Sequence, residues 1–557
     1  MRADTLRLYK SVHTWTGIVA GMALFIAFYA GALTVFKEPI ARWVSPPSPG
    51  VAAVSLADAP ALIAGTLKAR PSAAKDFTLY LQPAEHVPAR LGWSEKPPGG
   101  DGDDHDESHA HHYTATLDQQ QVRIDEDSPS ALPAFIDTLH RVVGLPKDTD
   151  PNRRVMGVIA ALYAVALVSG VILLLPTLVK DFFALRLGRN LKRMWLDAHN
   201  VVGIVSLPFH VVMALTAVVF AFHDDIYELQ DKLIHQGQLQ SFWRAGAGPA
   251  KPGAKPAPRD PATMLPPSQL LAQVQAMAPD FVPRVMQYAQ VGSPRATVRV
   301  WGMDPNDIAR SPRGGFVALD PYTGKVQNTD LLPGHQSALS ATLTSFFTLH
   351  FATYGGKPVQ WLYFLMGLGG AFLFYSGNLL WIESRRKAER RGKPAPVQSR
   401  STTLMAAASV GVCLGCVSGI SLSIVAGKWL HGHVADLGAW HQGVYYAVFL
   451  GSVAWAFVRG AARASVHLLW LAAACTVAIP VSSLLAWLWP QLGLWAHGSP
   501  AALGVDAVAL AGALCWAWVA RATARRVQAG RGDSVWSARR ADQTDAAPGG
   551  GLSGRTA

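Results

Sequence analysis

Long apolar runs constrain this chain more than any other feature of its sequence. Only 15% of its residues are charged, against about 25% in typical soluble domains. Runs of about 20 uncharged residues predict membrane-spanning helices, because lipid offers no partner for exposed backbone polar groups. The sequence therefore predicts a polytopic α-helical membrane protein with about eight transmembrane helices. The expected spans are residues 17–36, 155–179, 201–222, 358–382, 403–427, 440–458, 467–489 and 501–520.

Lysine and arginine gather in every second connection between these runs. They precede the first run, follow the last, and fill the connections near residues 180–193, 383–393 and 459–463. Positive residues favour the cytoplasmic side, so we expect a multi-pass protein with both termini in the cytoplasm. The formal net charge of +12 is then explained by basic residues that lie beside the lipid bilayer. No nucleic-acid partner is therefore expected.

The spans and loops divide the chain into seven parts. Each large loop, on the outer side, contains a helix-like stretch (56–69 or 267–278) followed by alternating, strand-like segments, which predicts one small α+β domain per loop. The parts are the N-terminus with the first span (1–37), the first outer domain (38–153), two spans around a basic loop (154–222), the second outer domain (223–357), the fourth span with a basic loop (358–400), a C-terminal bundle of four spans (401–522), and a disordered cytoplasmic tail (523–557).

A tandem repeat organises the first four spans. His13-Thr-Trp-Thr-Gly17-Ile-Val opens the first span, and His199-Asn-Val-Val-Gly203-Ile-Val opens the third. On the outer side, Thr-Leu-His140 precedes the second span and Thr-Leu-His350 precedes the fourth. Residues 1–180 and 190–390 are therefore interpreted as two copies of one module.

The repeat places its histidines in pairs, with His13 and His199 at the inner edge and His140 and His350 at the outer edge. Ionisable residues at a membrane are usually functional, and two facing imidazoles are what a six-coordinate b-type haem needs. We expect two haems b, held by these pairs as axial ligands. Interfacial hydrogen bonding is the alternative for each histidine.

Two glycines, Gly17 and Gly203, follow their histidines by four residues and share their helix face. They would let a flat macrocycle approach the backbone, although tight helix packing is an equal alternative. His210 breaks the repeat, because its counterpart in the alignment is Leu24. In a continuous helix it would share a face with His199, and it could ligate the outer haem, act as a relay or hydrogen-bond in the core.

A His/Asp-rich insert at residues 99–112 is a weak candidate metal site through His105, His109, His111 and His112, or else a disordered loop.

Asp506 is expected to be solvated, and the C-terminal spans show no buried charge. No nucleotide-binding motif occurs. Any electrons must therefore come from a membrane quinol or a cytoplasmic donor.

These motifs resemble those of the PepSY-associated transmembrane proteins, also called iron-regulated membrane proteins. The resemblance covers roughly residues 1–390, and the sequence departs from the family pattern at Thr216-Ala217 and in its longer tail. The motifs are residues 8–17, Gly31-Ala-Leu33, Leu139-His140-Arg141, Asp197-Ala-His199, Leu207-Pro-Phe-His210, Leu349-His350-Phe and residues 320–326.

The resemblance implies PepSY-like periplasmic domains in a bacterial inner membrane, and a diheme reductase of ferric siderophores or other ferric chelates. On this interpretation the haems carry the chemistry and no residue is an acid–base catalyst. Two alternatives remain open. One is a non-enzymatic module that anchors or regulates a periplasmic partner. The other is a siderophore or metal transporter, which the absence of buried charges and broken helices in the last four spans disfavours.

Overall fold

The computed structural model describes residues 3–47, 54–82, 89–95, 111–118, 121–127, 130–179, 191–237, 258–307, 314–388 and 396–538. The helices of the bundle are α1 (Ala3–Thr34), α5 (Asp150–Leu174), α7 (Leu191–Val205), α8 (Leu207–Ala221), α13 (Gly356–Ser384), α14 (Arg400–Trp429), α15 (Leu437–Arg459), α16 (Ala461–Leu488) and α17 (Pro500–Ala529). The shorter helices are α2 (Lys37–Val44), α3 (Ala59–Ala69), α4 (Leu132–Arg141), α9 (His223–Gln230), α11 (Pro267–Met277) and α12 (Ala338–Phe351).

Six helices in the described ranges are long and apolar enough to cross a membrane, so the chain is a multi-pass membrane protein. They are α1, α5, α13, α14, α16 and α17. The third predicted span is broken into α7 and α8, which meet at 71°. Pro208 lies in the first turn of α8, where its ring and missing N–H favour the start of a new helix.

Of the about eight predicted spans, the described residues support six, or seven when α7 and α8 are counted as one broken span. The predicted sixth span coincides with α15, a helix of 23 residues. This helix carries polar residues such as His441 and Gln442 in its first turns, and it is not among the six sufficiently apolar helices.

The two large loops build one antiparallel sheet of eight strands in the order β4-β3-β2-β1-β5-β6-β7-β8. The first loop supplies β1 (Asp76–Tyr80), β2 (Leu91–Glu95), β3 (His111–Asp118) and β4 (Gln121–Asp127). The second supplies β5 (Val282–Ala289), β6 (Thr297–Met303), β7 (Gly315–Leu319) and β8 (Val326–Leu331). Strands β1 and β5 join the halves, with Phe77 opposite Tyr288. The two predicted α+β domains therefore share one continuous sheet, and we call the whole the composite domain.

One face of this sheet carries the core of the composite domain. Leu62 of α3 and Val274 of α11 are fully buried in it, together with alternate residues of the strands. The rings of Phe77 and Tyr288 stack across the junction of the halves, with centroids 4.7 Å apart and planes at 5°. The period-two pattern of each strand explains why one face is buried.

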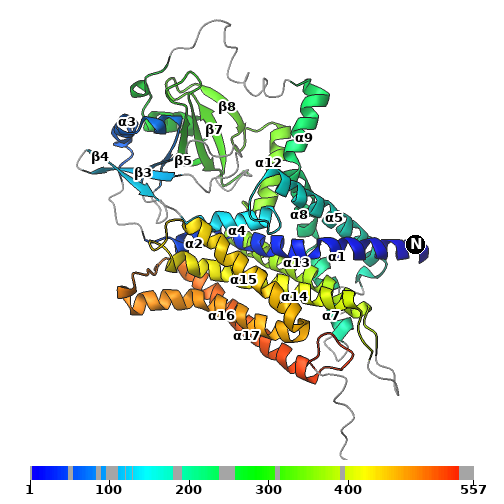
Figure 1. The fold of residues 1–557 in the computed structure, drawn as a ribbon. Helices are drawn as coiled ribbons and strands as arrows, with labels where there is room; N and C mark the ends of the chain where they lie inside the picture. The colour runs from blue at the N-terminus through cyan, green and yellow to red at the C-terminus, as the bar shows by residue number, and fades with distance from the viewer. Residues whose placement is uncertain are drawn as a thin grey trace, which may run out of the picture.

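The C-terminal helices α14–α17 lie alongside the N-terminal helices, and the sheet stands at one side of the bundle (Figure 1). Residues of α1, α4, α13, α14 and α15 share one hydrophobic core. Cys413 and Cys416 are buried in that core as free thiols, in agreement with a packing role. The C-terminal bundle is therefore continuous with the helices that carry the histidines.

Candidate functional site

His140 of α4 and His350 of α12 face each other near the sheet. Their ring centroids are 6.0 Å apart and their planes are tilted by 38°. We call them the sheet-side pair, and we call His13 of α1 and His199 of α7 the far-side pair. His199 is near enough to His13 for an electrostatic interaction. The structure thus brings together the histidines that the repeat predicted to be partners.

The two pairs lie at different depths of the bundle. His140 contacts α1 at Ala27, whereas His13 lies near the start of the same helix. His13 and Ala27 are about 20 Å apart along α1, because an α-helix rises about 1.5 Å per residue. This separation is a large part of the thickness of a hydrocarbon layer, which is about 30 Å.

All four imidazoles use Nδ1 for a hydrogen bond to a neighbouring helix. The acceptors are the Ala166 carbonyl for His13 at 2.8 Å, the Ala27 carbonyl for His140 at 2.8 Å, Ser376 Oγ for His199 at 2.9 Å and Thr216 Oγ1 for His350 at 2.7 Å. A carbonyl can only accept, so Nδ1 of His13 and of His140 is the protonated nitrogen.

The two hydroxyl partners also act as acceptors. Ser376 donates its own proton to the carbonyl of Leu373 at 3.0 Å, and Thr216 donates to the carbonyl of Val212 at 2.7 Å. Each hydroxyl therefore accepts from the Nδ1–H of its histidine. Metal-binding histidines are usually fixed in this way, because a bond at one ring nitrogen leaves the lone pair of the other for the metal.

The sheet-side pair fits a haem on its donor set and spacing. An imidazole–metal bond is about 2 Å long, so nitrogens that bind one metal from opposite sides are about 4 Å apart and their ring centres about 6 Å apart. The observed separation of 6.0 Å between the rings of His140 and His350 agrees with that value. Two nitrogen donors on opposite sides are what haem iron takes as axial ligands.

Burial keeps His350 in the neutral form that binds metals. Desolvation, followed by the neighbouring His140, lowers the pKa of His350 from 6.5 to about 3. The ring also packs against Phe220, with centroids 5.0 Å apart. His350 is therefore uncharged at physiological pH, as a ligand has to be.

Two glycines let the histidines approach the helices. A Cβ at Gly31 would lie 2.7 Å from His140 Nδ1, and one at Gly170 would lie 2.9 Å from His13 Cε1. The sequence indicated Gly31 only as part of a motif and did not indicate Gly170. The sequence predicted such a role for Gly17 and Gly203 instead. A Cβ added at Gly17 would meet nothing within 4 Å, and one added at Gly203 would meet only the Leu373 side chain, at 3.9 Å. Neither of them serves tight helix packing.

His210 lies beside the far-side pair and is 2% exposed. The hydroxyl of Tyr163 is 2.6 Å from its Nδ1, while its Nε2 has no hydrogen-bond partner among the described residues. The bend between α7 and α8 removes the shared helix face on which its relation to His199 was predicted. Its ring packs instead against Phe28 of α1, with centroids 5.6 Å apart.

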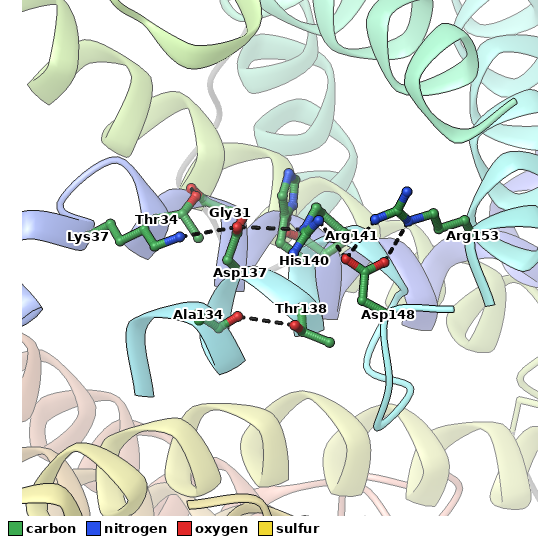
Figure 2. A network of polar contacts seen from close by, with 11 residues as sticks. Gly31, Thr34, Lys37, Ala134, Asp137, Thr138, His140, Arg141, Asp148 and Arg153 are labelled. Atoms are coloured by element: carbon green, nitrogen blue, oxygen red, sulfur yellow. Dashed lines mark hydrogen bonds and ion pairs between the residues drawn. The ribbon is translucent and has the colours of Figure 1, made fainter. Parts of the chain in front are cut away.

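A chain of charges runs past His140 along α4 (Figure 2). Asp137 is 3.3 Å from Lys37 and 3.6 Å from Arg141, and Asp148 binds Arg141 at 2.5 Å and Arg153 at 2.7 Å. Burial alone would raise the pKa of Asp137, but Lys37, Arg141 and His140 together lower it. The network joins the first residue of α2 to α4 and to the start of α5.

The predicted metal site in the His/Asp-rich insert gains no support. His111 bonds Glu126 at 2.9 Å on β3 and β4, and His112 is on β3. His105 and His109 lie outside the described residues. Within the ranges that the structure covers, no group of three or more His, Cys, Asp or Glu side chains could hold a metal ion.

A family profile described as the PepSY-associated TM region matches residues 10–384. The matched segment runs from α1 to α13 and contains all four paired histidines. No curated protein matches the chain.

Proposed function

The chain belongs to the PepSY-associated TM family, and from this membership and its paired histidines we propose that it is a diheme b-type cytochrome of a bacterial inner membrane. The observation that supports the proposal best is the sheet-side pair, whose rings are 6.0 Å apart with Nδ1 of each ring engaged by a neighbouring helix. In this proposal His140 and His350 hold one haem, and His13 and His199 hold the other.

When bound, each haem supplies a centre that takes up and releases one electron. The residues of the chain position the ligands. Nδ1 bonds fix the orientation of the imidazoles, and Gly31 and Gly170 allow them to approach the helices. Electrons would enter from a membrane quinol or a cytoplasmic donor at the far-side pair. They would leave on the side of the sheet, which we expect to be periplasmic.

The proposed acceptor is a ferric siderophore or another ferric chelate in the periplasm. Hard oxygen ligands suit ferric iron better than ferrous iron, so reduction loosens the chelate. The composite sheet stands on the same side as His140 and His350, because α4 follows β4 and α12 follows β8 directly in the chain. It would therefore hold the chelate near the exit of the electrons.

A visible spectrum of the detergent-purified protein tests this proposal. We expect a b-type spectrum that changes on reduction with dithionite, and about two haems per chain, one for each pair of axial imidazoles. A second assay follows the release of ferrous iron from a ferric hydroxamate added to reduced protein. A colourless protein from haem-sufficient cells would refute the cytochrome and leave a non-enzymatic module or a transporter.

A further inference from the structure

The helix that carries His140 is held from outside its own repeat unit. The ring of Phe135 on α4 packs against Tyr445 and Tyr446 of α15, with centroids 5.5 Å and 6.3 Å apart. The hydroxyl of Tyr446 donates to the carbonyl of Gly144 at 2.9 Å, just beyond the end of α4. The C-terminal bundle thus contacts both the first half of α4 and its C-terminal turn.

The end of α4 has a backbone that needs such support. Val143 has φ 51° and Gly144 has φ 87°. A β-branched residue rarely adopts a positive φ, and such a conformation persists where the surrounding contacts fix it. The N–H of Gly144 donates to the carbonyl of Leu139 at 2.9 Å and so ends the helix. The carbonyl of Gly144 accepts the hydrogen bond from Tyr446. In the sequence, His140 lies between the two residues that contact α15, Phe135 and Gly144.

A second contact fixes α2, which packs on α4. Trp43 of α2 is 1% exposed. Its indole Nε1 donates to Asp506 at 2.8 Å and to Ser483 at 3.1 Å. The ammonium of Lys428 lies 3.6 Å from the centroid of the Trp43 ring and donates to Ser483 at 3.3 Å. Lys428, Ser483 and Asp506 come from α14, α16 and α17 respectively.

These residues correct two expectations from the sequence. Asp506 binds Trp43 and Ser483 rather than water alone, and Lys428 is a charge that is only 1% exposed. Buried charges in a membrane protein are expensive unless they are paired, and a desolvated cation is attracted to the face of an indole ring. The cluster therefore fastens α2 firmly to the bundle.

We propose that the C-terminal bundle α14–α17 positions the axial ligand His140, with Tyr446, Phe135 and Trp43 as the positioning residues. The inference rests on the proposed function and extends it to the part of the chain beyond the family match. His350 needs no such help, because its Nδ1 partner Thr216 and its ring partner Phe220 belong to its own unit. A helix of ten residues has little stability of its own, so α4 depends on what it packs against.

The test uses full-length protein with Tyr446→Phe, Phe135→Ala and Trp43→Phe. Low-temperature electron paramagnetic resonance and a redox titration report each haem separately, and His140→Ala identifies the sheet-side signal. We expect Tyr446→Phe and Trp43→Phe to shift the sheet-side g-value and midpoint potential, and Phe135→Ala to lower its occupancy several-fold. The far-side signal should stay unchanged.

Trp429→Phe is the matched control, because it removes a bond to Ser482 at 2.8 Å inside the bundle without touching α4. It should leave both signals unchanged. Equal changes of both haems in Tyr446→Phe, or no change in any of the three variants, would overturn the inference while the cytochrome stands. A wild-type protein without haem would overturn the proposed function and the inference with it.

Discussion

In the first repeat unit the imidazoles donate to the backbone carbonyls of Ala27 and Ala166, whereas in the second they donate to the hydroxyls of Thr216 and Ser376. Ala166 and Ser376 are equivalent, since they follow His140 and His350 by the same number of residues. A carbonyl is present whatever the residue, but a hydroxyl depends on one side chain. For the far-side pair the position of the acceptor is therefore common to both units, and only the second unit can lose it by substitution. Ala27 and Thr216, the acceptors of the sheet-side pair, are not equivalent, because Thr216 aligns with Ala30.

The first helices of the two units differ in shape as well. Helix α1 is continuous over 32 residues, whereas α7 and α8 meet at 71°. His210 in the second unit stands where the first unit has Leu24, and both side chains are almost completely buried. The bend and the extra histidine occur together, so the second unit has a polar group in its core that the first unit lacks.

The largest effect should come from the ligands themselves. His140→Ala and His350→Ala take one histidine from each unit, and each should lose one of the two haems, because six-coordinate iron needs both axial nitrogens. The haem content per chain, measured as the pyridine haemochrome, checks this. Full retention of both haems in either variant would show that the units do not share one site.

Removing a hydroxyl acceptor should have the next largest effect. Thr216→Val and Ser376→Ala leave Nδ1 of His350 and of His199 without its partner, and loss of such a partner typically weakens a metal site 10–100-fold. Haem retention against apomyoglobin measures the change. Ala166→Ser adds a hydroxyl at the equivalent place of the first unit and should change nothing. Equal losses of haem in all three variants would contradict the proposed difference between the hydroxyl acceptors of the second unit and the carbonyl acceptors of the first.

Gly31 offers a test in the first unit. Its counterpart in the alignment is Ala217, yet a Cβ at Gly31 would lie 2.7 Å from His140 Nδ1. Gly31→Ala should therefore displace His140 and lower sheet-side occupancy several-fold, as followed by electron paramagnetic resonance. Gly443→Ala, where an added Cβ meets nothing within 4 Å, is the control. An unaffected sheet-side signal in Gly31→Ala would mean that α4 shifts freely.

Acid should reveal the burial of His350. Its pKa is 6.5 in an ordinary setting and about 3 in the fold, so the unfolded chain binds a proton that the folded chain excludes. The free energy of unfolding should then fall as the pH drops from about 6.5 towards 3. Thermal unfolding at pH 7 and pH 5 measures this, and His350→Gln should lose part of the drop. The same drop in both proteins would contradict the assignment to His350.

The smallest effect is expected for His210→Leu, which gives the second unit the residue of the first. If His13 and His199 are the ligands, both haems should remain, and only the far-side midpoint potential should move, because a neighbouring polar group is replaced by an apolar one. A redox titration resolves this. Loss of one haem would instead make His210 a ligand and place the bend between α7 and α8 in the site.

The sequence predicted the helices and the histidine partners well, because both depend on local patterns. Apolar runs mark spans wherever they occur, and the repeated H-x-x-x-G and T-L-H motifs indicated which positions are equivalent. The break at Pro208 had a signal in the sequence, but the continuous apolar run around it favoured one span. Haem binding itself stays a prediction.

The pairing of β1 with β5 had no such signal. Phe77 and Tyr288 are more than 200 residues apart, and strand pairing at that separation depends on how the intervening spans bring the loops together. The Trp43 cluster was missed for a similar reason. Lys428 and Asp506 are each isolated charges in the sequence, and only the packing of four helices shows that they surround one indole.

The sheet order reads outward from its centre as β1 to β4 on one side and β5 to β8 on the other. Two separate copies of one unit, related by a two-fold axis, would meet through their first strands in the same way. Each histidine pair likewise takes one member from each unit. By carrying both units in one chain, the protein replaces a dimerisation equilibrium with a tethered contact of high effective concentration. Its histidine pairs can therefore assemble even when a cell makes only a few copies.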